Sequence, residues 1–359
     1  MKFGNNSSVA VENHGNNQGV EVGVNHGSMI MQYGLGYSDT KALCYDIVRD
    51  ELTKYHAEAL VEAQKRNDEL FDKVVQKLDE KKMSDSQALI EFRNPAMQID
   101  YLEAQKAYIK VGSSELSELL SNILVKRISE SSRNLLQISL GEAIQVAPKL
   151  MQSQVASLAL IFIIKHTRRI SVNSHATFAS FLKDTIIPIF YSGVSKKDSE
   201  FQHLSFTGCS QQSVLSNNMI VYFKSNYAGL FMRGISESDI PKDEDDNNLN
   251  DIYPDLFIRC LNNKELFQIN AINRNDLDRK IKSNHKYYDV IMNLFDENIM
   301  SDEDIQKLIE NLVPEMKDVF TYWNDSGINS CILSSVGIVI GAEYAHQITG
   351  QDYDLNIWI

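Results

Sequence analysis

The sequence has few of the residues that staple a chain or anchor it in a membrane. Its 359 residues include only four cysteines, which form no CxxC or Cys/His pairing: Cys44, Cys209, Cys260 and Cys331. This spacing argues against a disulfide scaffold and a zinc site. The most apolar windows, residues 155–164 and 331–345, are shorter than the roughly 20 residues of a membrane-spanning helix. We expect two buried helices there, with the GxxxG spacing of Gly337 and Gly341 marking a close helix contact.

Positive charge is also scarce. The chain has 35 Lys and Arg against 48 Asp and Glu, and its net charge is −13. A general electrostatic grip on nucleic acid or anionic lipid is therefore not expected. The chain begins Met1-Lys2-Phe3-Gly4 and continues through Asn and Ser, without the apolar run of a signal peptide. We expect a cytoplasmic protein.

Known reaction motifs are missing. The sequence has no dinucleotide fingerprint, Walker loop, HExxH or GxSxG motif. The acidic run from Asp243 begins like a calcium loop, but Asn248 and Pro254 occupy the positions that need Gly and Glu. We predict no metal and no cofactor. An enzyme remains the alternative: a hydrolase or nuclease with a site dispersed over the C-terminal half. Its first candidates are His166, Arg168, His175 and His203.

Beyond residue 37 the apolar periodicity is helical, so the predicted fold is mainly α, a helical bundle with a short N-terminal β segment. Apolar residues at three-to-five-residue steps predict one long amphipathic helix from Ser38 to about Lys82. Further helices are predicted over residues 84–92, 96–111, 114–130, 133–146, 152–166, 174–191, 211–230, 275–297, 302–312, 314–324 and 329–348. The acidic stretch Lys242–Asp251 is predicted to be a loop.

We divide the chain into three parts. Residues 1–36 form a β-forming self-association motif, residues 37–168 a helical bundle, and residues 169–359 a second, mainly helical domain. The apolar chain end, residues 354–359, should pack against the body, because exposed Ile and Trp side chains would promote association.

The clearest positive cluster consists of Lys165, His166, Arg168 and Arg169. These residues lie at the C-terminal end of the predicted helix 152–166, where cations stabilise the helix dipole. The cluster has two interpretations: a structural cap, or a contact for a phosphate or nucleotide.

The first 34 residues differ from the rest. They carry only three charged residues, Lys2, Glu12 and Glu21, and are rich in Asn, Gly and Val. Residues 4–14 and 15–26 align as two units, and a degenerate third begins at Gly27. The valines alternate along each unit, which predicts strands with one apolar face. Such short strands must be covered by a neighbouring unit or by another molecule.

Residues 16–25, NNQGVEVGVN, with Met31-Gln32 behind them, resemble the RIP homotypic interaction motif. This is the amyloid-forming signalling motif of animal necroptosis kinases, with relatives in fungal and bacterial immune proteins. Its core is Ile/Val, Gln, Ile/Val, Gly; Val20, Val22 and Gly23 match, and Glu21 replaces Gln. The resemblance implies self-association through Asn16, Asn17, Val20, Glu21, Val22, Gly23, Val24 and Asn25. The body resembles an uncharacterised family of bacterial proteins with a similar leader and C-terminal ending.

Glu21 is the departure from the motif that matters. If leaders of different copies stacked parallel and in register, neighbouring Glu21 carboxylates would lie about 4.8 Å apart. Their repulsion would cost roughly 1 kcal/mol per neighbouring pair even in water. Assembly should therefore be triggered, templated by a partner, or confined to a small closed oligomer. An intramolecular β-roll or trimeric stalk and a disordered leader are the alternatives.

The repeat predicts an interaction protein, and the resemblance implies a signalling role in bacterial antiphage immunity. Its N-terminal motif would bind a second copy, or another protein with a similar motif, and the helical body would sense a trigger or deliver the effect. Besides the enzyme, the other alternative is a structural assembly protein with a trimerising β stalk.

Overall fold

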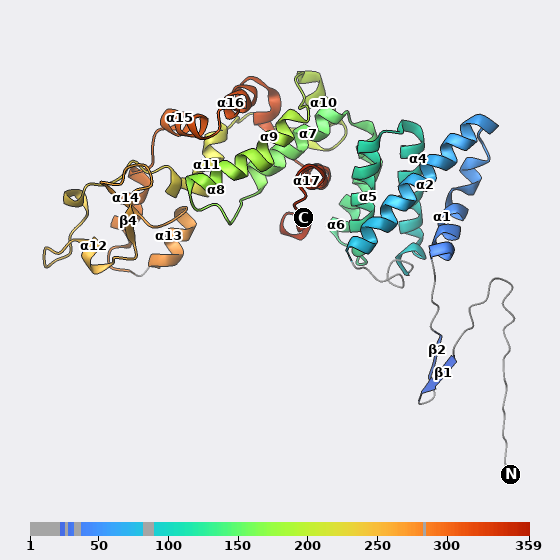
Figure 1. The fold of residues 1–359 in the computed structure, drawn as a ribbon, viewed down its shortest axis with the longest axis horizontal. Helices are drawn as coiled ribbons and strands as arrows, with labels where there is room; N and C mark the ends of the chain where they lie inside the picture. The colour runs from blue at the N-terminus through green and yellow to red at the C-terminus, as the bar shows by residue number, and fades with distance from the viewer. Residues whose placement is uncertain (1–21, 26–27, 32–36, 82–89, 283–284) are drawn as a thin grey trace, which may run out of the picture.

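The computed structural model describes residues 22–25, 28–31, 37–81, 90–282 and 285–359. Figure 1 shows an elongated, mainly helical molecule, with a helical bundle at one end, a central group of helices and a smaller lobe at the other end. The predicted fold class is confirmed. In the described ranges, no helix combines the length and apolar character needed to cross a membrane.

The bundle at one end is formed by the first helices of the body. They are α1 (Tyr37–Leu52), α2 (Ala57–Glu80), α4 (Pro95–Val111), α5 (Ser114–Ser129) and α6 (Leu135–Val146). Local signals in the sequence set several of these ends. The Asn94 side chain caps α4, Gly112 ends it with φ 72°, and the Ser113 side chain then caps α5.

The predicted single helix from Ser38 to Lys82 is wrong. The chain turns at residues 53–56 and continues as α2, so α1 packs against α2. The turn lets Val48 and Leu52 of α1 pack with Ala63 of α2 in a small buried cluster. No glycine or proline marks this turn, and the burial gained by packing overrides the helical periodicity.

The central group contains most of the later helices. They are α7 (Gln152–Ile161), α8 (His175–Phe181), α9 (Ile187–Tyr191), α10 (Asp198–Phe206), α11 (Met219–Tyr227), α15 (Asp302–Leu312), α16 (Met316–Asp325) and α17 (Ser335–Thr349). A π-helical turn, Phe162–His166, extends α7, and another, Leu182–Ile186, joins α8 to α9. The predicted helices 152–166 and 174–191 are therefore confirmed as continuous helical stretches.

Of the two apolar windows, residues 155–164 are helical as predicted, whereas the second begins with the strand β6 (Cys331–Leu333) and becomes helical only in α17, so the predicted helix over 329–348 starts too early. Helix α17 packs more extensively against α7 than any other pair of elements does in the described ranges. A Cβ atom on Gly341 would lie 2.7 Å from the backbone oxygen of Leu158, and one on Gly337 would lie 2.0 Å from that of Cys209. The GxxxG spacing therefore marks a close backbone approach, as expected.

The small lobe and its surroundings differ from the prediction. Residues 211–230 are not one helix: β3 (Ser210–Gln212) precedes α11 and pairs antiparallel with β6 (Cys331–Leu333). Residues 275–297 form two helices, α13 (Arg274–Ile281) and α14 (Tyr288–Glu297). The pair β4 (Phe257–Arg259) and β5 (Phe267–Ile269) was not predicted, nor was α10. The predicted loop 242–251 leads into the short α12 (Leu249–Ile252).

One cluster of buried apolar residues runs from Cys44 to Leu355. It includes residues on both sides of residue 168, where the sequence places a domain boundary, because α17 packs against α5 and α6 as well as α7. A second cluster, between Ala228 and Phe295, forms the core of the small lobe. All four cysteines are free thiols, in line with their spacing in the sequence, and all four are buried.

The apolar chain end packs against the body, as predicted. The Trp358 Nε1 donates a hydrogen bond to the His166 carbonyl oxygen at 2.8 Å, and its ring meets Phe162 edge-on with centroids 5.0 Å apart. Tyr353 meets the same Phe162 ring edge-on at 5.2 Å. The last residues thus cover the π-helical turn that extends α7.

Candidate functional site

Part of the predicted self-association motif lies in a β-hairpin. Strand β1 (Val22–Asn25) pairs antiparallel with β2 (Ser28–Met31), so that Val22 lies opposite Met31 and Val24 opposite Met29. The second sequence unit therefore supplies one strand, and the degenerate third unit supplies the other. Gly23 and Asn25 belong to β1. The other motif residues, Asn16, Asn17, Val20 and Glu21, lie outside the described residues, and self-association remains a prediction.

The hairpin has two strands in the part of the chain that the structure describes. A two-stranded hairpin is at best marginally stable in water, and any edge of it that no further strand covers presents unpaired backbone N–H and C=O groups. Such edges are templates for pairing with further strands. The hairpin therefore offers a backbone surface suited to strand addition.

The structure separates the predicted cation cluster. The Lys165 ammonium turns inward and donates to the carbonyl oxygens of Asn329 at 2.8 Å and Cys331 at 2.7 Å. It also lies 5.3 Å from the centre of the Trp323 ring. Burial lowers the pKa of Lys165 to about 8. Lys165 thus joins α7 to the segment before β6 and is committed to neutral acceptors.

The other three residues of the cluster, His166, Arg168 and Arg169, differ in their surroundings. The His166 carbonyl holds Trp358, and burial, assisted by the nearby Lys165 charge, lowers the pKa of the His166 side chain. Arg168 and Arg169 line an open hollow. Of the four residues proposed for an anion contact, only these two arginines therefore remain together at the surface.

The histidines suggested for an enzyme site are not brought together into a catalytic arrangement. His175 lies with Nε2 2.9 Å from the Leu230 carbonyl oxygen, and His203 lies with Nδ1 3.0 Å from the Gln154 amide nitrogen. Neither contact joins the histidine to a nucleophile. Among the described residues, no group of three or more His, Cys, Asp or Glu side chains could hold a metal ion.

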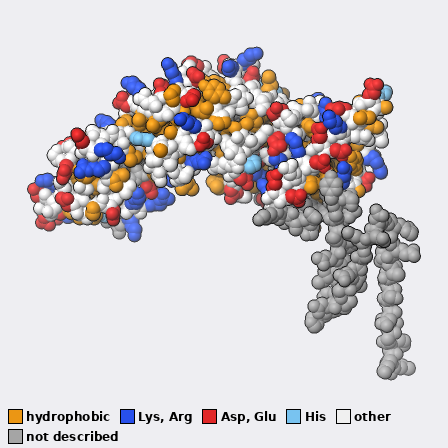
Figure 2. All heavy atoms as spheres, viewed as in Figure 1, with side chains coloured by type: hydrophobic (Ala, Val, Ile, Leu, Met, Phe, Trp, Pro, Cys, Tyr) orange, Lys and Arg blue, Asp and Glu red, His pale blue; other side chains and the backbone are white. Residues whose placement is uncertain are grey.

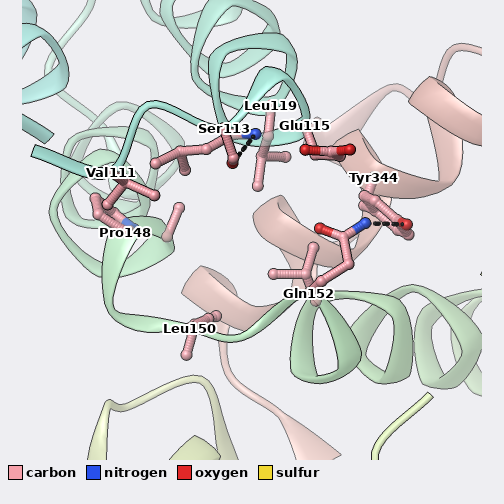
Figure 3. A pocket seen from close by; sticks show the side chains of 11 residues that line it. Val111, Ser113, Glu115, Leu119, Pro148, Leu150, Gln152 and Tyr344 are labelled. Atoms are coloured by element: carbon pink, nitrogen blue, oxygen red, sulfur yellow. Dashed lines mark hydrogen bonds between the residues drawn. The ribbon is translucent and has the colours of Figure 1, made fainter. Parts of the chain in front are cut away.

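A hollow of about 360 Å³, which the sequence did not reveal, lies where the α4–α5 turn, the α6–α7 connection and α17 meet (Figure 3). Apolar side chains, among them Leu119 and Leu150, form part of its wall. Polar groups line the rest, and the Gln152 Nε2 donates to the Tyr344 hydroxyl at 2.5 Å. The lining includes no nucleophile paired with a base, so this hollow is suited to binding rather than to covalent catalysis.

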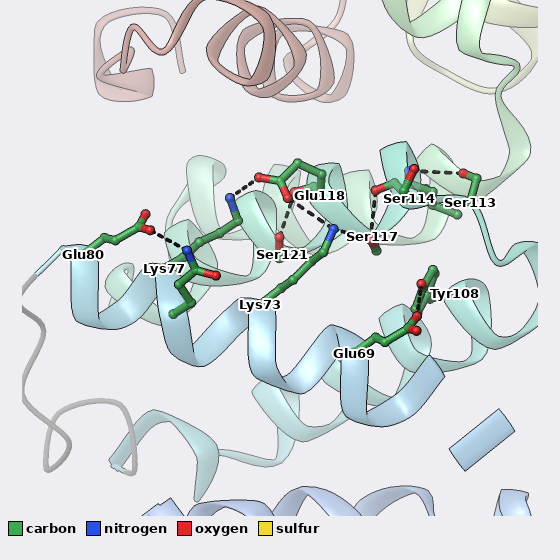
Figure 4. A network of polar contacts seen from close by, with 12 residues as sticks. Glu69, Lys73, Lys77, Glu80, Tyr108, Ser113, Ser114, Ser117, Glu118 and Ser121 are labelled. Carbon is green, nitrogen blue, oxygen red and sulfur yellow. Dashed lines mark hydrogen bonds and ion pairs between the residues drawn. The ribbon is translucent and has the colours of Figure 1, made fainter. Parts of the chain in front are cut away.

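A polar network ties α2 to α5 and α4 (Figure 4). Lys73 and Lys77 both pair with Glu118, and Lys73 also donates to the Ser117 hydroxyl at 2.8 Å. Burial would raise the pKa of Glu118, but the two lysines outweigh it and lower the pKa. The Tyr108 hydroxyl donates to Glu69 at 2.6 Å. These contacts fix the register of the bundle helices and account for the charge on this face without a ligand.

Figure 2 shows acidic and basic side chains interspersed over the visible face of the bundle, with hydrophobic side chains gathered over the central helices.

A protein-family model matches residues 34–359. The chain belongs to this family. The match covers the helical body and begins shortly before α1. Searches of curated proteins and of solved structures each found no match.

Proposed function

We propose that the protein is an interaction protein that self-associates through residues 1–36 and uses its helical body as the attached scaffold or effector. The observation that carries the proposal is the hairpin: the second half of the Val-Glu-Val-Gly tetrad lies in β1, paired in register with β2. Its outer edges are suited to adding strands from other copies.

The body supports this division of labour. Among the residues whose burial the structure describes, its main buried cluster extends from Cys44 to Leu355. A body whose helices carry a core of their own can stay folded while the leader changes strand partners. Stacked leaders would also bury the alternating valines that a single short strand leaves uncovered.

The proposed partners are a second copy of the chain or another protein with a similar N-terminal motif. The resemblance to the RIP homotypic interaction motif is what suggests a signalling setting such as antiphage defence in the bacterial cytoplasm. The Glu21 carboxylate supplies a reason for control, because like charges in a stack oppose assembly until a trigger or a template offsets them.

The test is the size of the full-length protein in solution, measured by light scattering after size-exclusion chromatography. Val20→Asp with Val22→Asp should abolish oligomers, because charges inside a dry β stack cost several kcal/mol unless they are paired. The matched control is Val61→Asp with Val290→Asp, which places the same charges on exposed helix positions of the body. Control and parent should form the same oligomers. If the leader variant still assembles like the parent, the leader is not the contact.

A second measurement separates the leader from the body. The chain from residue 37 onward should give the circular dichroism spectrum of a folded helical protein and should remain monomeric. An unfolded spectrum would mean that the leader is part of the fold, and would contradict the two-part design.

A further inference from the structure

Arg168 and Arg169 line a hollow of about 500 Å³ between the segment after the π-helical turn and the end of α17. Thr185 and Gln351 line it from two other segments, and Ile170 lies at its surface. We propose that this hollow binds the phosphate group of a small molecule, with the two arginines as the phosphate contacts. The inference goes beyond self-association, because the hollow lies entirely in the helical body.

Among the described residues, the Arg169 guanidinium bonds to neutral partners only. Its Nη1 donates to the Gln351 Oε1 at 3.1 Å and approaches the Thr185 Oγ1 at 3.4 Å. A guanidinium carries five N–H donors in a planar fork that matches phosphate oxygens. The Arg169 guanidinium is therefore held in place by two neutral acceptors, Gln351 and Thr185. Its other N–H donors remain available to a charged acceptor such as a phosphate oxygen.

Arg168 is half-buried, and across the described ranges its side chain makes no hydrogen bond and no ion pair. Two more deeply buried cations do pair with a carboxylate: Arg127 with Asp100 at 2.8 Å, and Lys126 with Glu343 at 3.0 Å. Acidic residues outnumber basic ones, 48 to 35. Arg168 and Arg169 thus lie side by side without a carboxylate partner among the described residues, in a chain where carboxylates are in excess.

Two features of the hollow oppose an anion. Asp184 lines the same space, although it accepts a hydrogen bond from Ser180 at 2.5 Å and pairs with neither arginine. The C-terminal end of α17, at Thr349 and Gly350, adds the negative end of a helix dipole. A phosphate monoester, with about two negative charges at neutral pH, or a diphosphate, with more, is attracted by two guanidiniums more strongly than a monovalent anion is. The two guanidiniums outweigh one carboxylate and the fractional charge of the helix dipole, so the net field still favours an anion, and a dianion more than a monoanion.

The remaining lining indicates that the ligand is more than a free phosphate. Ile170 is 86% exposed beside the arginines and offers an apolar surface to a ring. Ser171 and Thr349 add hydroxyl groups. A volume of about 500 Å³ lies within the usual range for small-molecule sites, roughly 300 to 1,000 Å³. A molecule of mononucleotide size, with its phosphate on the arginines and its ring on Ile170, fits this chemistry.

The test is calorimetric titration of the full-length protein with inorganic pyrophosphate, ATP, AMP and adenosine at constant ionic strength. We expect saturable binding of the phosphate-bearing probes at one site per chain, tighter for ATP than for AMP, and none for adenosine. Absence of saturable binding by pyrophosphate, ATP and AMP up to millimolar concentration would overturn the proposal. Binding of adenosine as tight as that of AMP would also overturn it, because the phosphate would then contribute nothing.

Three variants locate the site. Arg168→Gln should weaken ATP binding about ten- to hundredfold, the effect of losing a charged hydrogen bond. Asp184→Asn should tighten binding, because it removes the opposing carboxylate. Lys183→Gln is the matched control: it removes the same charge from the neighbouring exposed position, which does not line the hollow, and should change binding less than threefold. Equal losses in Lys183→Gln and Arg168→Gln would show nonspecific attraction and contradict the proposal.

Arg169→Gln is a further variant, and its thermal unfolding must be measured alongside binding because Arg169 also joins Thr185 to Gln351. Lost binding with an unchanged melting temperature supports a direct contact. Unchanged binding overturns the assignment of Arg169.

Discussion

The Lys126 ammonium lies 3.0 Å from a carboxylate oxygen of Glu343, a side chain that is only 1% exposed. The same ammonium lies 2.9 Å from Asp352 and donates to the Tyr353 carbonyl oxygen at 2.6 Å. One lysine of α5 therefore joins the bundle to α17 and to the chain end. Burial raises the pKa of Glu343 despite this partner, whereas the two carboxylates outweigh burial at Lys126 and raise its pKa.

Removing the lysine should destabilise the fold strongly. In Lys126→Met the buried Glu343 loses its positive partner, and breaking such a pair typically costs about 3–5 kcal/mol of unfolding free energy. Urea unfolding followed by circular dichroism measures the loss. The control is Lys81→Met, because Lys81 lies 3.9 Å from Asp352 in a largely exposed pair worth about 0–1 kcal/mol. Similar losses in both variants would contradict the central role of Lys126.

The raised pKa of Glu343 predicts a pH dependence of stability. The folded state binds this proton more tightly than the unfolded state, whose carboxyl has a pKa near 4.5. The contribution of Glu343 to stability is therefore fully present below about pH 4.5 and is lost as pH rises through the raised value. Glu343→Gln removes this dependence, so the variant should gain stability relative to the parent as pH rises from about 4.5 to 7.5. Unfolding curves of both proteins, measured side by side at several pH values, test this prediction. A difference in unfolding free energy that does not change with pH would refute it.

The Gly341 contact predicts a steric penalty. In Gly341→Ala the new Cβ would lie 2.7 Å from the Leu158 backbone oxygen, so α17 and α7 must move apart at a cost of about 1–3 kcal/mol. Gly141→Ala, inside α6, is the matched control: its Cβ meets only the Asp100 side chain, at 3.2 Å. Replacing a helix-interior glycine gains about 0.5–1 kcal/mol from backbone entropy. Melting temperatures should fall for Gly341→Ala and change little for Gly141→Ala.

The leader should respond to pH through Glu21. Carboxylates brought together in a parallel stack raise each other's pKa, so association should strengthen as pH falls through the raised value. Glu21→Gln restores the usual tetrad and removes the charge, and should assemble more readily at pH 7 with little pH dependence. Light scattering of both full-length proteins between about pH 5 and 8 gives the comparison. Superimposable curves would mean that the Glu21 carboxylates do not meet in the assembly.

Helices with strong local signals could be predicted from the sequence. Helix α15 occupies residues 302–312 as predicted, because Ser301 caps it, acidic residues fill its first turn and Pro314 follows it. The turn at residues 53–56 could not be predicted, because it depends on Val48 and Leu52 packing against Ala63 rather than on a local breaker. Strands of three residues, such as β3 and β6, are too short for alternation to identify.

The candidate sites show the same limit. The sequence identifies the cationic residues near residue 168 but not the partners that their side chains bind in the folded protein. Lys165 turns away because its acceptors, at Asn329 and Cys331, come from a segment more than 160 residues further along the chain. Gln351 reaches Arg169 from a similar separation. Only the folded chain shows which cations remain available to a ligand.

The burial of all four cysteines has a practical consequence for labelling. Burial raises the pKa of Cys44 to about 12 and that of Cys209 to about 11, so at neutral pH both remain thiols rather than reactive thiolates. Cys260 and Cys331 are enclosed as well. A single cysteine introduced into the leader would therefore be the preferred target of a maleimide dye in the native protein. Distances between dyes on different copies could then be measured without first replacing the four native cysteines.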